Sequence, residues 1–208
     1  MIIRVDPERP DPRRLGPAID ALRKDAVIIY PTDTGYAFGC AMSSPKGIAK
    51  LRKLKGFGEK HHKPLTMLVG QFVDFGKYGH LGNKVFRVIK RITPGPYTVI
   101  LPATHEVPRQ MKNRDKEIGM RWPAHPVCAM LVELLGEPLL TGSVTPAEGE
   151  IELEDPDELD RFHGHEVAMV IDGGFIYPQP STVLRVVDDA IEVLREGQGP
   201  LDDVLGAA

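Results

Sequence analysis

Helical and extended sequence patterns alternate along the whole of this chain, and this alternation restricts the fold more than any other feature. Residues 12–24 carry apolar side chains at helical spacing, and Asp11 followed by Pro12 is typical of a helix start. Residues 27–30 then form a short, continuous apolar run of the kind that makes a buried strand. A regular succession of such elements predicts an α/β protein.

Further elements follow by the same criteria. We expect helices over 45–55, 83–92 and 126–135, a short helix from Asp155-Pro156, and strands over 65–69, 97–101, 117–121, 138–142, 168–171, 182–187 and 191–195. The 208 residues contain neither an internal repeat nor a low-complexity linker. The sequence therefore predicts one domain over 1–208, in which a large twisted mixed sheet is flanked by helices. The order of the strands stays open.

Composition excludes several classes of protein. A hydrophobic content of 42% is enough for a core, so disordered and collagen-like chains are ruled out. The apolar runs fall well short of the roughly 20 residues that a membrane helix needs, and the first residues do not resemble a secretory signal. Cys40 and Cys128 are isolated from each other, which favours reduced thiols. We expect a cytoplasmic protein without membrane contact.

Charge is distributed unevenly. Residues 1–121 contain 23 Lys and Arg against 11 Asp and Glu, whereas residues 122–208 contain 3 against 18. The net charge of −3 therefore conceals a strongly basic first part. Two interpretations stay open: the acidic residues simply solvate a loop and a short helix, or the basic part forms a surface or cavity for an anion such as a nucleotide or RNA.

The helix over 45–55 places one lysine in an unusual position. Its apolar residues form one face, and Lys55 falls roughly 40° from the middle of that face. An inward lysine is costly unless it meets a negative charge. Either Lys55 extends its amine past the helix end, where a cation is favourable, or it binds an anion.

Two loops bring together groups suited to ligand binding. Residues 56–64 combine glycine with clustered positive charge, which suits a phosphate-binding loop or a solvated surface, and they lack the P-loop pattern. Residues 30–36 place two threonines and Asp33 between two expected strands, where they orient a small ligand or only stabilise a turn. His163 and His165 have no third ligand at metal-site spacing, so we predict no protein-bound metal.

Seven short motifs, taken in order, resemble those of the YrdC-like family of threonylcarbamoyl-adenylate synthases, and they are most similar to its YciO branch. The motifs are Tyr30–Tyr36, Leu54-Lys55-Gly56 with Lys63-Pro64-Leu65, Pro94–Thr98, Gly119–Pro123, Pro138–Ser143, Pro180–Val183 and Leu194–Gly197. The match to the family runs from about residue 14 to 200. Each motif is weak by itself, and it is their order that carries the resemblance.

The resemblance implies a fold, a reaction and a set of site residues. It implies a positively charged cavity and the synthesis of threonylcarbamoyl-adenylate from L-threonine, bicarbonate and ATP with Mg²⁺, linked to the modification of tRNA. It also implies a connection with double-stranded RNA. By resemblance, Lys55, Lys63, Thr98, Ser143 and Arg195 would bind ATP, Thr34, Arg121 and Ser181 would bind threonine, and Lys55, Arg121 and Ser143 would act in catalysis.

Three positions depart from the synthase pattern and leave alternatives open. Phe57 stands where the family has arginine, and Thr145 stands where it has asparagine. Leu68 stands near the position at which the family has a threonine-binding histidine. Loss of a bidentate cation at a phosphate site weakens catalysis. The sequence is therefore consistent with a synthase-type nucleotidyltransferase, with an RNA-binding protein of weak or no synthase activity, and with an adenylate-forming enzyme that uses another acceptor.

Overall fold

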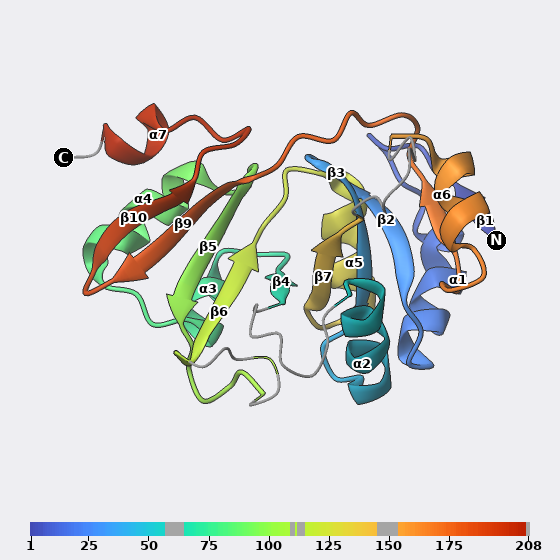
Figure 1. The fold of residues 1–208 in the computed structure, drawn as a ribbon, viewed down its shortest axis with the longest axis horizontal. Helices are drawn as coiled ribbons and strands as arrows, with labels where there is room; N and C mark the ends of the chain where they lie inside the picture. The colour runs from blue at the N-terminus through green and yellow to red at the C-terminus, as the bar shows by residue number, and fades with distance from the viewer. Residues whose placement is uncertain (57–64, 109–110, 112–114, 145–153, 207–208) are drawn as a thin grey trace.

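The protein is built on one ten-stranded mixed sheet, seen in a computed structural model that describes all residues except 57–64, 109–110, 112–114, 145–153 and 207–208 (Figure 1). The strands lie in the order β1-β8-β2-β3-β7-β4-β6-β5-β9-β10. Neighbouring strands in the sheet are mostly distant in sequence, so long-range pairing sets this order. The predicted class, a helix-flanked mixed sheet, is confirmed.

The helices and strands have the following bounds. In chain order they are β1 Ile2–Arg4, α1 Pro12–Arg23, β2 Ile28–Thr32, β3 Gly35–Ala41, α2 Pro45–Leu54, β4 Thr66–Leu68, α3 Val73–Tyr78, α4 Asn83–Ile92, β5 Tyr97–Pro102, β6 Glu117–Arg121, α5 Pro126–Leu135, β7 Leu139–Ser143, α6 Pro156–His163, β8 Val170–Asp172, β9 Thr182–Val187, β10 Ala190–Arg195 and α7 Asp202–Leu205.

The predicted helix starts are confirmed in detail. The side chains of Asp11, Ser44 and Asp155 each accept a backbone N–H in the first turn of their helix, and each helix has proline in its first turn. Three short elements, β1, α3 and α7, were not predicted, because three to six residues carry too little periodicity.

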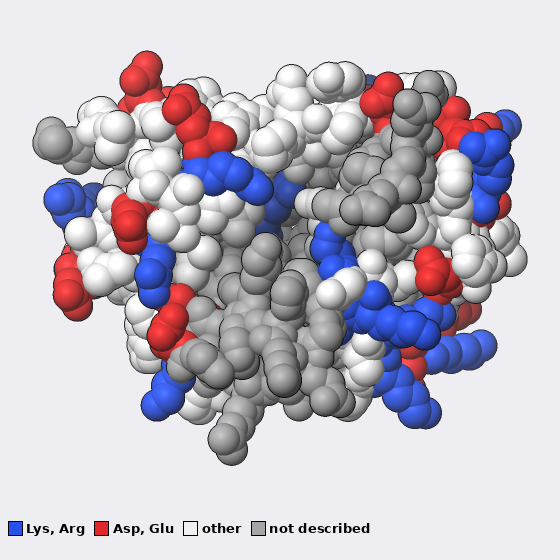
Figure 2. All heavy atoms as spheres, viewed as in Figure 1, with Lys and Arg blue, Asp and Glu red and all other residues white. Residues whose placement is uncertain are grey.

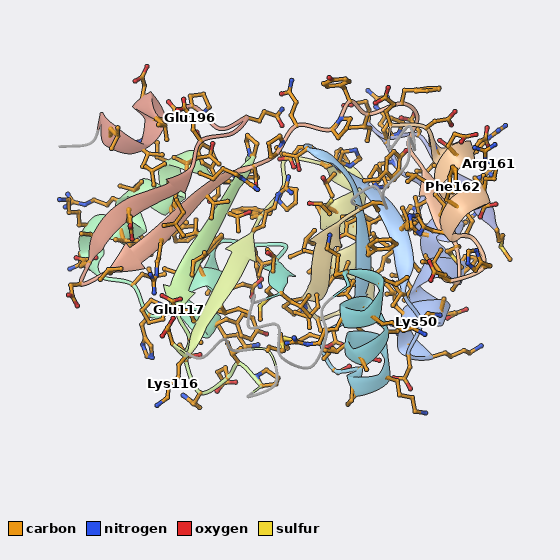
Figure 3. All side chains as sticks on the ribbon, viewed as in Figure 1. Lys50, Lys116, Glu117, Arg161, Phe162 and Glu196 are labelled. Carbon is orange, nitrogen blue, oxygen red and sulfur yellow. The ribbon has the colours of Figure 1, made fainter. Side chains whose placement is uncertain are left out.

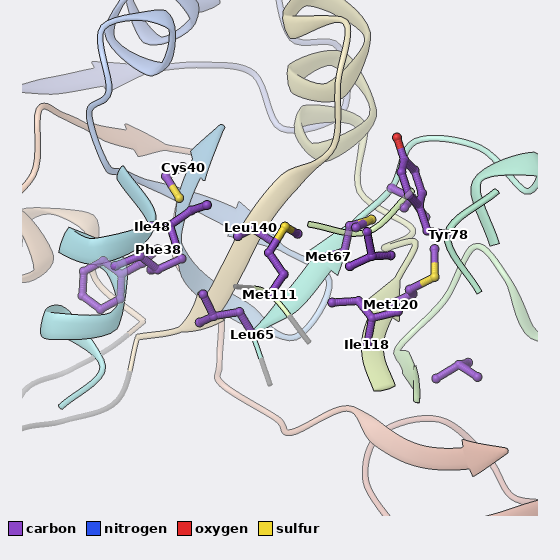
Figure 4. Packing of buried hydrophobic residues seen from close by; sticks show 14 of the residues in the cluster. Phe38, Cys40, Ile48, Leu65, Met67, Tyr78, Met111, Ile118, Met120 and Leu140 are labelled. Atoms are coloured by element: carbon purple, nitrogen blue, oxygen red, sulfur yellow. The ribbon is translucent and has the colours of Figure 1, made fainter. Parts of the chain in front are cut away.

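Three clusters of buried hydrophobic residues pack against the sheet, and the two larger ones lie on its two sides. One contains Phe38, Ile48 and Met120 (Figure 4). It also includes residues of α2, α3, α4 and α6. The other packs α1 and α5 against Tyr30 and Leu68. In β-sheets generally, each strand is rotated by about 20–25° relative to its neighbour. Over ten strands this twist brings α2 and α6 to the front of Figure 1 and leaves α3 and α4 behind the opposite end of the sheet.

The twist also leaves part of the sheet without a helix. In Figure 1, β5, β6, β9 and β10 face the viewer uncovered, whereas α1 and α5 lie behind β2, β3 and β7. Strands β4 and β7 pair antiparallel and join the two halves of the sheet. Within the described ranges, none of the helices has the length and apolar character needed to span a membrane.

Candidate functional site

A cavity of about 420 Å³ opens at the middle of the sheet, lined in part by residues of β4, β5, β6, β7 and β9. Six of the eight predicted site residues line it: Lys55, Thr98, Arg121, Ser143, Ser181 and Arg195. Figure 2 shows Lys and Arg side chains on both sides of the hollow at the centre of this face. The structure therefore joins six positions that span 140 residues of sequence.

Strand pairing explains why these side chains meet. Thr66 pairs with Gly119 on one side and with Thr141 on the other, and Gly119 also pairs with Ile100. Directly paired residues point to the same side of a sheet, so β4, β5, β6 and β7 all turn these positions toward the cavity. Val183 joins them from β9 through its pairing with Thr98.

Arg121, at the end of β6, is the most buried cation of the cavity, with 9% of its side chain exposed. Its Nη2 donates to Oδ1 of Asp33, while Oδ2 of Asp33 accepts the backbone N–H of Ala124 at 2.9 Å. The Nε of Arg121 is buried and has no acceptor among the described residues. A buried guanidinium with an unused donor is suited to holding a carboxylate or phosphate.

A second cation enters from β10. Arg195 donates through Nε and Nη2 to the carbonyl oxygen of Ser181, at 3.1 and 2.8 Å. The hydroxyls of Ser181 and Thr98 lie 2.9 Å apart. These contacts attach the guanidinium to the start of β9 and gather three polar side chains at one wall.

A β-bulge determines the direction of Arg195. Val193 pairs with Leu184 and Arg195 pairs with Val183, so Leu194 is an extra residue in β10. In a strand without the bulge, Arg195 would lie two residues after Val193 and would point to the same side of the sheet as Val193, away from the cavity. The bulge returns Arg195 to the side of Val183, which lines the cavity.

Lys55 follows the last turn of α2 and reaches the cavity from the opposite wall. Its Nζ donates to the carbonyl oxygen of Ser143 at 2.5 Å. The lysine stem lies against Gly142, where an added Cβ would be 2.9 Å from its Cδ. The amine thus extends past the helix end and also lines the cavity, while its binding of an anion stays a prediction.

The structure treats the other predicted positions differently. Thr34 does not line the cavity; its backbone N–H donates to Oγ1 of Thr32 at 3.2 Å in the β2–β3 turn, so its role in binding stays a prediction. Lys63, Phe57 and Thr145 lie outside the described residues. Leu68 is fully buried in the cluster beneath α1 and α5 and does not line the cavity, whereas Thr66, two residues earlier on the same side of β4, does.

Sequence reasoning missed polar residues of this site. Thr66 and Thr141 line the cavity but were not among the predicted site residues. Asp33 was expected to orient a small ligand or to stabilise a turn, and its pairing with Arg121 was not foreseen. The buried cysteines are not nucleophiles here: burial raises the pKa of Cys40 to about 12 and also raises the pKa of Cys128.

Histidine and carboxylate positions do not form a metal site in the part of the chain that the structure describes. His163 packs edge-on against Phe38 and has its Nδ1 3.3 Å from Oε2 of Glu166, while His165 is exposed. His163 thus has partners within the fold, and the absence of a protein-bound metal stays a prediction.

Comparison with known proteins gives consistent results. A protein-family model described as "Telomere recombination", for the Sua5, YciO and YrdC proteins, matches residues 20–197. "Uncharacterized protein YciO" of Escherichia coli K12 is 35% identical over 202 residues, which cover 97% of both chains. The crystal structure of E. coli YciO aligns with a TM-score of 0.91 over 99% of both chains, at 34% identity.

Similarity to synthases is more distant. A "Putative threonylcarbamoyl-AMP synthase" of Methanocaldococcus jannaschii is 31% identical over 176 residues, which cover 84% of this chain and 81% of that protein. The crystal structure of P. abyssi Sua5 complexed with L-threonine has a TM-score of 0.88 at 24% identity. The alignment covers all of this chain and 60% of the Sua5 chain. At this identity the similarity shows a shared fold. The greater similarity to YciO agrees with the motifs.

Proposed function

Because this chain belongs to the Sua5/YciO/YrdC family, we propose that it is a threonylcarbamoyl-AMP synthase-type enzyme that uses ATP, bicarbonate and L-threonine in the central cavity. The observation that carries the proposal is the convergence of Lys55, Arg121 and Arg195 on one hollow. Distant relatives that bear the synthase name, and a Sua5 structure with L-threonine, support this chemistry.

The reaction requires two anions to approach each other. Bicarbonate takes up a proton and gives carbon dioxide and water, and the neutral amino group of threonine adds to the carbon dioxide and loses a proton to give a carbamate. A carbamate oxygen then attacks the α-phosphorus of ATP, and the bond from this phosphorus to the oxygen shared with the β-phosphate breaks to release pyrophosphate. Cations fixed in position lower the repulsion and stabilise the developing charge. In this arrangement Arg121 would hold the carboxylate of the amino acid, while Lys55 and Arg195 would hold phosphates from opposite walls.

The remaining polar groups suit orientation rather than proton transfer. The hydroxyls of Thr98 and Ser181, which lie close together, and the residue Ser143 line the same cavity. Attack by a carbamate oxygen does not require a general base on the protein, and the lining residues that the structure describes include neither a histidine nor a carboxylate. Mg²⁺ would enter with the phosphates of ATP, since the described residues offer no ligand set of their own.

A pyrophosphate-release assay with ATP, bicarbonate and threonine tests the proposal. We expect Lys55→Ala and Arg195→Ala to reduce release by roughly 100-fold, whereas Lys50→Ala, on the outer side of α2 in Figure 3, should leave it unchanged. Release at background level in the wild type, with bound ATP demonstrated by calorimetry, would contradict the synthase proposal. The same assay with other amino acids tests the alternative of a different acceptor.

RNA binding is a second candidate function, favoured by the surface of α2. Lys46, Lys50 and Lys53 are exposed on this helix, whose end supplies Lys55 to the cavity. A row of lysines suits a phosphate backbone, and its affinity would fall steeply with salt. Fluorescence anisotropy with duplex RNA should show that the triple alanine variant weakens binding; salt-independent or absent binding would exclude this function.

A further inference from the structure

Asp33 binds the guanidinium of Arg121, a residue of the cavity wall, and a backbone N–H at the same time. It lies in the two-residue turn between β2 and β3, where Thr32 pairs with Gly35. One of its oxygens accepts from Nη2 of Arg121 and the other accepts from the N–H of Ala124. Its side chain is only 12% exposed and that of Arg121 only 9%, so the ion pair is largely shielded from water.

These two contacts restrain Arg121 from both directions. Arg121 ends β6, and Ala124 lies in the short connection that leads into α5. One carboxylate therefore fixes the guanidinium and the backbone that follows it, across 88 residues of sequence. The turn itself is held by Oγ1 of Thr32, which donates to the carbonyl oxygen of Gly35 at 2.6 Å, and Gly35 has a positive φ of 117°. The acceptor is thus presented on a rigid support.

The guanidinium retains binding capacity beyond this pair. Only Nη2 donates to Asp33, and the buried Nε has no acceptor among the described residues. A buried cation without Asp33 would carry an uncompensated charge and a free choice of rotamers. With Asp33 in place, the charge is compensated on one edge and Arg121 keeps a fixed orientation at the cavity wall.

We propose that Asp33 is a positioning residue, which orients Arg121 to receive the carboxylate of the amino-acid substrate. The inference rests on the proposed function, in which Arg121 binds that carboxylate. Asp33 acts through Arg121 and does not contact the reacting atoms, because both of its oxygens are already engaged. Its removal should therefore affect amino-acid binding and leave ATP binding nearly unchanged.

Asp33→Asn tests this directly, and Asp172→Asn is a matched control. Asp172 also accepts from an arginine, at 3.2 Å from Nε of Arg4, and from a backbone N–H, that of Gly174 at 2.8 Å. Its side chain is 16% exposed, but its arginine lies outside the cavity. We expect Asp33→Asn to raise the KM for threonine by about 10- to 100-fold, as for a lost charge-assisted hydrogen bond, with the KM for ATP changed less than about twofold.

A double variant checks the pathway of the effect. If Asp33 works only through Arg121, then Asp33→Asn combined with Arg121→Lys should lose little more than Arg121→Lys alone. An additive loss, an equal rise in both KM values, or an effect matched by Asp172→Asn would overturn the proposal. Should Asp33→Asn fail to fold, Asp33→Glu keeps the charge, displaces it by one methylene and is judged by the same criteria.

Nuclear magnetic resonance of the Arg121 Nε–Hε group separates this inference from the synthase proposal, because it requires no turnover. In the wild type we expect a sharp, slowly exchanging signal, identified by its loss in Arg121→Lys. Asp33→Asn should broaden or shift it, whereas Asp172→Asn should not. An unchanged signal refutes the positioning role even if the protein is an active synthase, and a lost signal supports the role even if threonine is not the substrate.

Discussion

Gly142 offers a way to displace Lys55 without removing it. A Cβ at this position would lie 2.9 Å from Cδ of Lys55 and 3.3 Å from its Cε. Ordinary contacts of this kind are 3.4–4 Å long, so the lysine stem must move away. Because the obstacle is a flexible side chain rather than backbone, the fold should tolerate Gly142→Ala while the amine leaves its place beside Ser143.

The expected loss follows from the contact that Lys55 would make with ATP. A hydrogen bond to a charged group contributes about 1.5–3 kcal/mol, and a displaced lysine would retain part of it. We therefore expect ATP to bind Gly142→Ala about 10-fold more weakly, which corresponds to about 1.4 kcal/mol. Unfolding stability should change by less than about 1 kcal/mol, a typical effect where no core contact is lost.

Calorimetric titration with ATP and Mg²⁺, together with urea unfolding, measures both quantities. Lys55→Ala sets the upper limit of the loss. Gly16→Ala is the matched control, because a Cβ there has no neighbour within 4 Å, and it should slightly stabilise α1 and leave ATP binding unchanged. If Lys55→Ala weakens ATP binding and Gly142→Ala does not, the close approach of the lysine stem to Gly142 is not what places the amine.

Three further predictions concern the core. Gly39→Ala would place a Cβ 2.6 Å from Cε1 of the fully buried Tyr30, so urea unfolding should show a loss of about 1–3 kcal/mol; an unchanged midpoint would contradict the packing. Burial raises the pKa of Cys40 to about 12 and also raises the pKa of Cys128, so a thiol reagent at pH 8 should modify neither until urea unfolds the protein. Burial also raises the pKa of Asp74, so this carboxyl favours folding when protonated and loses that contribution as the pH rises above its unfolded-state value of about 4. Relative to wild type, Asp74→Asn should therefore gain more stability at pH 7 than at pH 3, and unfolding curves showing the opposite trend would refute this.

The family of proteins could be identified from local motifs, and the elements from their periodicity. Capped helices at Pro12, Pro45 and Pro156 were predictable because a cap involves residues only two or three positions apart. The cationic character of the site was also visible, since the basic residues are concentrated before residue 122. The six lining residues follow from family resemblance rather than from local pattern.

Tertiary structure alone decided how the site is assembled. Asp33 and Arg121 are 88 residues apart, and their contact depends on where the β2–β3 turn and the end of β6 meet. Leu68 was expected near the substrate, yet it packs beneath α1 and α5. Arg195 reaches the cavity because of a bulge at Leu194 that alternation cannot predict. Periodicity reports on neighbours within a turn or a strand, whereas strand order, register and twist arise from long-range pairing, which creates the cavity.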